Sequence, residues 1–424
     1  MPKGSLLQNL SSAGSAGLTR RRELWLLFTL AGIQFTHIMD FMIMMPLGPQ
    51  FTALFGISDA QFGLLVSAYT LAAGASGLAA STYIDRFGRK RLLLTLYLLF
   101  ALATLACGLA TGYAPLMAAR IAAGVFGGVL SALCQTIVAD VVPFERRGRA
   151  MGIVMTAFSV STVAGVPLGL FLAAHLSWHA PFLVIAGLSL LLAVFAAATL
   201  PVLDAHLRQS QRFSTWAGIR EVLSDANHQK AFLFSALMMC TGFTVIPYIT
   251  IFMQANTGLR ADQVPYIYLC GGVVTLFTAR LFGRMTDRRG KVPTFRRLAL
   301  AAALPLVGIT LLDGAPLVAV FAVSTLMFML MSGRMIPGMA ILTSAANPAL
   351  RGTFMTLNAS VQSAAMGVAA FIGGQLISRG PQGQVLNYWM AAAVGLVATL
   401  GSVWLAGRLA LHGAPASPGA GPKN

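Results

Sequence analysis

Very few charged residues lie inside the long apolar segments of this 424-residue chain. Asp40 is the only acid well inside one, and Arg120 and Arg334 are the deep cations. Arg280 lies near a segment end, from which its side chain can reach an interface. A charge buried in a membrane costs several kcal/mol, so it usually faces a cavity and has a partner. If these segments cross a membrane, the three deep charges are the candidates for functional chemistry.

Asp40 and the residues around it have the properties that proton exchange requires. At a rise of about 1.5 Å per residue, Asp40 and Arg120 both lie roughly 10–15 Å below the same surface. Burial and a nearby guanidinium act in opposite directions on a carboxyl group, so its protonation responds to hydration. His37, one helical turn earlier, is a candidate proton relay. The alternatives are a structural ion pair for Asp40 and a hydrogen-bonded packing role for His37.

The composition supports a membrane as the solvent. Hydrophobic residues make up 57% and charged residues 10% of the chain, and its mean hydropathy is +0.77. Globular proteins carry roughly 45–50% apolar and about 25% charged residues. The net charge of +17 is concentrated in alternate short loops, which is the positive-inside pattern and not a nucleic-acid surface. The cysteines lie in apolar segments without a CxxC spacing, so we expect no metal site and no disulfide: Cys107, Cys134, Cys240 and Cys270.

The apolar segments predict an all-α membrane protein with twelve transmembrane helices. A span needs about 20 helical residues. The predicted spans are 23–48, 61–84, 91–111, 114–141, 149–173, 180–202, 230–254, 263–284, 295–313, 316–345, 353–377 and 387–409. Because their number is even, both termini lie on one side. The Lys and Arg bias makes that side the cytoplasm, and we expect the cell inner membrane.

The chain repeats itself, which predicts two pseudo-symmetric six-helix bundles. The charged string Asp85–Arg91 recurs as Asp287–Lys291, each time after the second span of its half. An Arg-Gly pair opens both fifth spans, at 147–148 and 351–352. Many secondary transporters consist of such duplicated units. The predicted organisation is a disordered cytoplasmic tail (1–22), an N-terminal bundle (23–203), a cytoplasmic linker (204–229), a C-terminal bundle (230–411) and a disordered tail (412–424).

The linker between the bundles contains an amphipathic pattern. Phe213, Trp216, Ile219 and Leu223 recur at helical spacing, opposite charged residues. A helix lying on the inner membrane surface has this pattern. The alternative is an ordinary tether with chance periodicity.

With these motifs, the chain resembles the major facilitator superfamily from about residue 23 to residue 408. The family's loop motif matches at Gly283–Lys291, whereas Ser81 replaces the leading glycine of the first copy. Arg120 and Gly124 are similar to the fourth-span motif, and the stretch Gly165–Gly169 is similar to the antiporter motif of span 5. The segments 39–49 and 332–338 resemble the drug and arabinose-efflux permease branch.

The resemblance implies roles for several charged residues. Spans 1 and 4 line the central cavity in this family, so we expect Asp40 to pair with Arg120. The loop aspartate docks on the N-terminus of helix 11, where a carboxylate is favoured, and locks the outward-facing state. We therefore expect a conformational latch, with flanking topology charges as the alternative. Its members are Asp85, Arg86, Gly88, Arg89 and Asp140, mirrored by Gly283, Asp287, Arg288 and Gly290, and Gly165, Pro167 and Gly169 form the span-5 motif.

Polar residues on the cavity spans are candidate substrate contacts. Arg334, near mid-depth on span 10, could hold an anionic group of a substrate or pair with backbone carbonyls. The other candidates are Gln34, Gln135, Thr244, Tyr248, Asn358 and Gln362. Many such residues instead make interhelical hydrogen bonds.

These observations predict a transporter that exports a small organic molecule by proton antiport through alternating access. The alternatives are proton-coupled uptake and, more distantly, a receptor that transports nothing. No GxxxxGK[ST] motif indicates ATP use, and we expect no cofactor. We expect no enzyme, because the GxSG at 74–77 lacks a membrane-embedded histidine partner and is explained by small-residue packing. The expected partners are the substrate, protons and lipid, without nucleic acid, and we expect a monomer.

Overall fold

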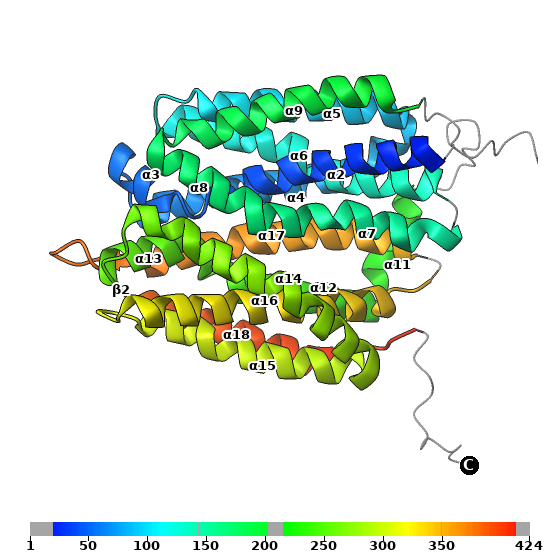
Figure 1. Cartoon of the computed structure of the whole chain (residues 1–424). Helices are drawn as coiled ribbons and strands as arrows, with labels where there is room; N and C mark the ends of the chain where they lie inside the picture. Colours follow the sequence, from blue (N-terminus) through cyan, green and yellow to red (C-terminus); the bar gives the residue numbers. More distant parts are fainter. Residues whose placement is uncertain (1–19, 143, 202–214, 349, 413–424) are drawn as a thin grey trace, which may run out of the picture.

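Helices dominate the part of the chain that the structure describes. The computed structural model describes residues 20–142, 144–201, 215–348 and 350–412, and within these ranges twelve helical segments are long and apolar enough to cross a membrane. The predicted tails (1–22 and 412–424) lie almost wholly outside the described residues. Figure 1 shows the helices lying side by side in one bundle, the N-terminal half above the C-terminal half.

The N-terminal half contains the first six spans. Its helices are α2 (Arg20–Ile43), α3 (Gly48–Phe55), α4 (Asp59–Tyr83), η1 (Ile84–Arg86), α5 (Arg89–Gly108), α6 (Tyr113–Val141), α7 (Phe144–Val160), the π-helical turn η2 (Ser161–Gly165), α8 (Val166–His175) and α9 (His179–Thr199). A capping box starts α4, since the Ser58 hydroxyl accepts from the N–H of Gln61 and the Gln61 side chain accepts from the N–H of Ser58. This cap fixes where the second span begins.

The C-terminal half repeats this arrangement. It contains α12 (Ala226–Phe243), η3 (Ile246–Tyr248), α13 (Ile249–Asn256), η4 (Ala261–Gln263), α14 (Val264–Arg289), α15 (Lys291–Gly308), η5 (Ile309–Leu311), α16 (Leu317–Ala345), α17 (Arg351–Leu376), the antiparallel strands β1 (Ser378–Arg379) and β2 (Val385–Leu386), and α18 (Tyr388–Ala406). Gly290, at φ +86°, occupies a backbone conformation that favours glycine and separates α14 from α15.

Three of the spans are interrupted, two of them beside Pro167 and Pro247, where the sequence predicts kinked helices. The first breaks at a turn over residues 44–47 before Pro49, and the fifth contains η2 directly before Pro167. The seventh breaks at η3, which contains Pro247. Proline lacks the N–H that a continuing helix needs and clashes with the preceding turn. Hydropathy averages over such breaks, so the prolines and not the hydropathy indicate where they lie.

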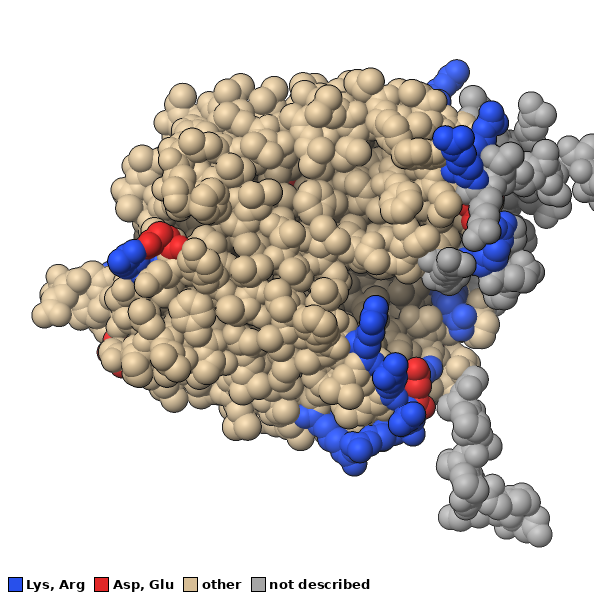
Figure 2. Space-filling view, in the orientation of Figure 1, with Lys and Arg blue, Asp and Glu red and all other residues tan. Residues whose placement is uncertain are grey.

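Lysine and arginine side chains gather at one end of the bundle (Figure 2). We call it the basic end, defined by the loops 86–91 and 288–291, and both ends of the described chain also lie there (Figure 1). Short loops, α3 and the β1–β2 hairpin occupy the opposite end. The distribution matches the predicted positive-inside arrangement.

The two halves share one apolar cluster at the opposite end and have separate apolar clusters towards the basic end. One apolar cluster contains residues of both halves, including Phe51, Phe62, Tyr248 and Ile251. Towards the basic end each half has its own cluster, around Leu133 in one and Phe295 in the other. Figure 2 shows the surface hollowed between the halves near the basic end. The structure is therefore closed at the opposite end and opens towards the basic end.

The linker helix α11 (Thr215–Ser224) packs on the bundle. Val222 is fully buried and Ile219 nearly so, in the cluster that contains Phe295. The helix contacts α12, α17 and α4, so it bridges the two halves at the basic end. Of the predicted apolar positions, Ile219 thus faces protein, whereas Leu223 is 49% exposed. Phe213 lies outside the described residues, as does the side chain of Trp216.

Candidate functional site

The structure brings Asp40 of α2 and Arg120 of α6 together inside the N-terminal half. The Arg120 Nη1 donates to Asp40 Oδ2 at 2.9 Å and to the Asp40 carbonyl at 3.3 Å. Neither side chain is more than 1% exposed. Both charges are therefore fully removed from solvent in this conformation, and each depends on the other for compensation.

Aromatic groups complete this charged site. The Arg120 guanidinium lies over the Tyr69 ring of α4, 4.2 Å from its centroid, which is a cation–π contact. The His37 ring lies 5.7 Å from that of Phe100 and 6.4 Å from that of Tyr69. The predicted relay residue is thus close to the ion pair, in a partly buried position. Sequence reasoning missed Tyr69, because a tyrosine in an apolar span resembles an ordinary packing residue.

Several buried polar atoms at this site have no hydrogen-bond partner among the described residues. They are His37 Nδ1, Asp40 Oδ1, Tyr69 Oη, Thr104 Oγ1 and Arg120 Nε. A buried polar atom without a partner is costly, so such atoms usually bind water or a ligand. These atoms lie around a single buried carboxylate. Thr104 was also missed, because a lone threonine in a span carries no signal.

Arg334 of α16 is the deep cation of the C-terminal half. It is 2% exposed, and its Nη2 donates to the Met238 carbonyl of α12 at 2.8 Å. Its Nε and Nη1 have no hydrogen-bond partner within the described part of the chain. The sequence left open whether Arg334 pairs with backbone carbonyls or holds a substrate anion. The structure shows one carbonyl bond, and it satisfies only one of the three guanidinium nitrogens.

The other predicted substrate contacts lie in different surroundings. Gln34 exchanges hydrogen bonds with Ser131, Gln362 donates to Ser235, and Tyr248 donates to the Ala370 carbonyl. These three are engaged in interhelical bonds in this conformation. Thr244 donates to the Cys240 carbonyl of its own helix, Gln135 is exposed, and Asn358 is buried with its Oδ1 unpartnered among the described residues.

The loop residues of the predicted latch are placed in part. Arg89 Nε donates to Asp140 Oδ2 at 3.1 Å, and Arg89 Nη1 donates to the Ile84 carbonyl. The Asp85 side chain lies outside the described residues. Arg86, Asp287 and Arg288 are exposed. A Cβ added at Gly283 would meet nothing within 4 Å, so no neighbouring helix packs closely against this glycine in the present conformation.

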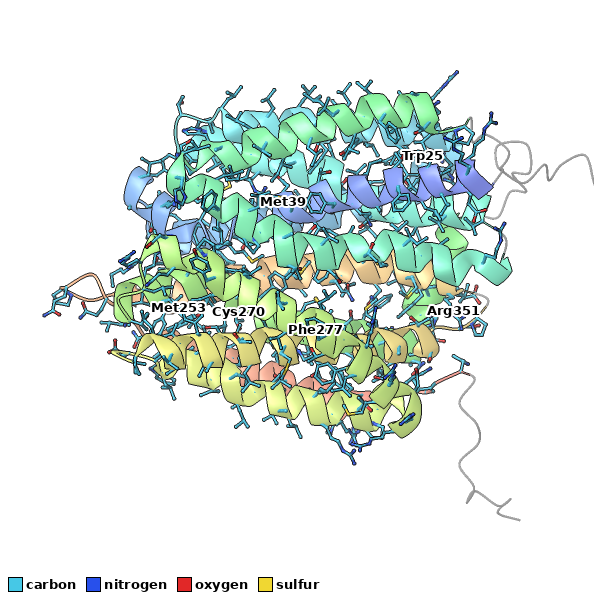
Figure 3. All side chains as sticks on the ribbon, in the orientation of Figure 1. Trp25, Met39, Met253, Cys270, Phe277 and Arg351 are labelled. Atoms are coloured by element: carbon cyan, nitrogen blue, oxygen red, sulfur yellow. The ribbon has the colours of Figure 1, made fainter. Side chains whose placement is uncertain are left out.

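The span-5 motif packs against the helix that carries Asp40. A Cβ at Gly165 would lie 3.2 Å from Met39 Sδ, and one at Gly169 would lie 2.6 Å from Ile43. Pro167 follows η2 in the first turn of α8. In Figure 3 Met39 lies between α2 and this span. The two glycines thus let span 5 pack closely against Met39 and Ile43, the α2 residues before and after Asp40.

An ion pair and an aromatic contact close the opposite end between the halves. Arg379 of the hairpin donates to both carboxylate oxygens of Asp59, from Nε at 2.7 Å and from Nη2 at 2.8 Å. The Phe62 and Tyr248 rings meet edge to face at 6.2 Å. We call this set the outer clamp. This clamp could not be predicted from the sequence, because Asp59 and Arg379 belong to different halves.

Twelve spans in two six-helix halves, with a buried ion pair inside the N-terminal half, are typical of a membrane transporter of the two-repeat type. The family model of the Major Facilitator Superfamily matches residues 30–370, and this chain belongs to that superfamily. It is therefore a multi-pass membrane protein that transports a small molecule, and it is not an enzyme.

Related proteins agree with this assignment. The chain is 26% identical over 353 residues to the uncharacterized MFS-type transporter YtbD of Bacillus subtilis, covering 83% of this chain and 85% of YtbD. It is 25% identical over 237 residues to a probable sugar efflux transporter of Helicobacter pylori, covering 56% and 59%. Identity to multidrug resistance protein 2 of B. subtilis is 23% over 279 residues, covering 64% and 69%.

Solved structures confirm the predicted fold. The D-xylose-proton symporter superposes with a TM-score of 0.73 at 18% identity, covering 91% of this chain and 97% of that one. A bacterial homolog of the human lysosomal transporter Spinster, inward-facing and occupied, gives 0.70 at 15% identity, covering 92% and 98%. At such identities the likeness concerns the fold.

Proposed function

We propose that this chain exports a small organic molecule from the cytoplasm in exchange for protons. The buried Asp40–Arg120 pair carries the proposal, since Asp40 is a deep carboxylate whose other oxygen has no hydrogen-bond partner among the described residues. A carboxylate at this depth is costly to ionise unless its partner stays in place. Its protonation is therefore coupled to the local arrangement of α2 and α6.

The coupling follows from charge compensation. When Asp40 is protonated, it no longer neutralises Arg120, so the pair loosens. When Asp40 releases its proton towards the cytoplasm, the ion pair with Arg120 re-forms. The present conformation, in which the end of the bundle opposite the basic end is closed, has this pair formed. Protons taken up outside and released inside drive the substrate outwards, provided that only one side is accessible at a time. His37 and the Tyr69 hydroxyl lie where they can relay the proton.

The direction rests on the relatives and on span 5. Two relatives are described as efflux or multidrug resistance proteins, and the Gly165–Gly169 segment resembles the antiporter motif. Uptake by symport remains the alternative, which a symporter of the same fold illustrates. We further propose that the basic end faces the cytoplasm of the cell inner membrane, with both termini there, and that the protein acts as a monomer.

In this scheme two sets of contacts set the accessible side. The outer clamp holds the present state. The loop latch, from Asp85 with Arg86, Gly88, Arg89 and Asp140, would hold the other state, with Asp287 as its mirror. The Arg89–Asp140 bond already orders the loop end of α5 against α6.

The test uses inside-out membrane vesicles with an acid interior and an interior-pH dye. A screen of drug-like, sugar-like and metabolite compounds added outside should find a compound that makes the interior less acid, because each molecule moving in lets protons out. Symport would move protons inwards with the substrate. An acidification in response to every active compound would therefore contradict export by antiport.

Asp40→Asn is the decisive variant. It keeps the side-chain shape and removes the titratable proton, so transport driven by a pH gradient should fall to background while substrate exchange persists. Asp313→Asn, which alters an exposed acid that accepts from Asn256, is the matched control and should keep gradient-driven transport. Full gradient-driven transport by Asp40→Asn would exclude Asp40 as the coupling acid.

A further inference from the structure

A series of aromatic rings begins at the buried ion pair. The Arg120 guanidinium lies 4.2 Å from the centroid of the Tyr69 ring. Tyr69 stacks on Phe41, the residue after Asp40, with centroids 5.6 Å apart and an interplanar angle of 25°. Phe41 stacks in turn on Phe243, with centroids 6.1 Å apart and an angle of 27°. We call Tyr69, Phe41 and Phe243 the aromatic column.

The aromatic column crosses from one half of the protein to the other. Tyr69 and Phe41 belong to α4 and α2 of the first half, whereas Phe243 is the last residue of α12 in the second. Phe41 packs against both the apolar cluster that the halves share and the first half's own cluster. Among the described residues, one other ring contact joins the halves, that of Phe62 with Tyr248 in the outer clamp. Within the same part of the chain, only the column leads by ring contacts from the ion pair to the second half.

Close backbone packing fixes both ends of the column. A Cβ added at Gly124, one turn after the paired arginine on α6, would lie 2.3 Å from the Tyr69 carbonyl oxygen. A Cβ added at Gly373 of α17 would lie 2.3 Å from the carbonyl oxygen of Thr244, the residue after Phe243. Interiors packed this closely transmit displacements, because they have little room to absorb them. The column therefore has one end fixed in each half.

Protonation of Asp40 changes the charge that acts on the column. With Asp40 ionised, the Arg120 guanidinium bonds to the carboxylate at 2.9 Å. With Asp40 neutral, the guanidinium keeps the Asp40 carbonyl and the Tyr69 ring as partners. Cation–π attraction is strongest where water is excluded, so the ring then carries more of the compensation. Phe41 and Phe243 are only partly buried, so their contact can shift when Tyr69 and α2 move.

We propose that the aromatic column ties the protonation state of Asp40 to the relative position of the two halves, with Phe41 and Phe243 as positioning residues. The inference rests on the proposed proton coupling at Asp40, because that carboxyl group supplies the change in charge. It adds the route by which the second half responds. The contact between Phe41 and Phe243 is the point at which this route crosses between the halves.

The test uses the proton itself as the ligand and requires no substrate. Spin labels are attached at Leu54→Cys of α3 and Leu386→Cys of β2, two exposed positions at the opposite end, one in each half (Figure 1). The four native cysteines of the full chain are replaced by alanine. Without further changes, acidification should raise the ratio of long to short distances about 10-fold, because protonated Asp40 favours the state open at this end.

Phe243→Leu and Phe41→Leu each remove one ring and keep an apolar side chain. In either variant the same acidification should change the ratio of distances by less than about 2-fold. The double variant should respond as each single variant does, since all three lack the same contact. Phe243→Tyr keeps the ring and should respond like the unchanged chain.

Phe328→Leu is the matched control. The Phe328 ring is also partly buried against the shared cluster, but its partner Tyr268, with centroids 5.3 Å apart, belongs to the same half. Its loss should leave the response to acid intact. The unfolding midpoint of each variant and its distance distribution at high pH show whether the fold is retained.

A role in packing alone predicts a different result. Loss of a contact that only holds the halves together shifts the ratio of distances equally at high and low pH and leaves the response to acid unchanged. A full response in Phe41→Leu and Phe243→Leu would therefore overturn the inference.

Asp40→Asn separates this outcome from failure of the proposed coupling. If Asp40→Asn does not respond to acid while both leucine variants do, the column is excluded and the coupling at Asp40 stands. A response in Asp40→Asn would contradict coupling at Asp40, and the role of the column with it. A chain that does not respond before any of these changes would contradict both proposals.

Discussion

Gly127 of α6 keeps open the space where His37 and Tyr69 approach each other. A Cβ at this position would lie 2.9 Å from the Tyr69 hydroxyl and 3.0 Å from His37 Nε2. Gly127→Ala should therefore displace these two groups and lower gradient-driven transport about 10-fold or more, as expected for a misplaced proton relay. The fold should survive, because the ends of side chains can move. Proton flux in vesicles together with the unfolding midpoint measures both effects.

Gly152 of α7 provides the matched control for that change. A Cβ there would meet nothing within 4 Å, so Gly152→Ala should raise stability by about 0.5–1 kcal/mol through helix propensity and leave proton flux intact. Normal flux in Gly127→Ala, with His37 and Tyr69 otherwise unchanged, would show that protons do not pass between them.

At the scale of elements, the outer clamp ties the hairpin of one half to α4 of the other. Asp59 is almost buried, while the Arg379 side chain is 38% exposed. Asp59→Asn removes the charge from this pair and should shift the population towards a state open at this end. Spin labels across the opposite end should then report a larger fraction of long distances.

Asp262→Asn tests whether any charge loss at this end has that effect. Asp262 pairs with Arg260 within the C-terminal half and with both side chains exposed, so it does not join the halves. Exposed pairs contribute little, and its loss should not change the distance distribution. An unchanged distribution in Asp59→Asn would mean that the apolar contacts around Tyr248 alone keep this end closed.

For the whole molecule, the two halves differ in charge compensation: Arg120 pairs with Asp40, whereas no ion pair among the described residues involves Arg334. If a monoanion leaves as a proton enters, both steps carry positive charge inwards, so transport is electrogenic. A potential of 100 mV then contributes about 2.3 kcal/mol for each charge moved. In inside-out vesicles without a pH gradient, a lumen-positive potassium diffusion potential should then accelerate accumulation of an anionic substrate. Accumulation that ignores the potential would indicate electroneutral exchange.

How much of this was predictable depends on the range of the interaction. The Asp40–Arg120 contact could be predicted, because two charges at equal depth on two cavity helices have few other partners. Tyr69 and Thr104 could not, since residue type does not distinguish a packing residue from a site residue inside an apolar span. The outer clamp forms in only one conformation of the transporter. The same sequence adopts every conformation, so it does not show which contacts form in which one.

The elements show the same division. Hydropathy located the twelve spans, and the Lys and Arg loops indicated the basic end. Hydropathy averages over the breaks at residues 44–47, η2 and η3, two of which lie beside prolines. The linker helix docks on the bundle because Val222 finds apolar partners in the folded C-terminal half. Local pattern predicts an element, and its docking depends on surfaces that do not yet exist in the extended chain.

The seam between α4 and α17 has a consequence for how this transporter can change in evolution. Gly74 and Gly77 face the backbone and hydroxyl of Ser360, and Gly367 faces Thr70 and Leu71, all at separations with little or no room for a methyl group. Larger side chains at these glycines would push α4 and α17 apart. Changes in cargo preference are therefore expected at positions away from this seam. Related transporters could therefore differ in substrate while keeping the same α4–α17 contact between their halves.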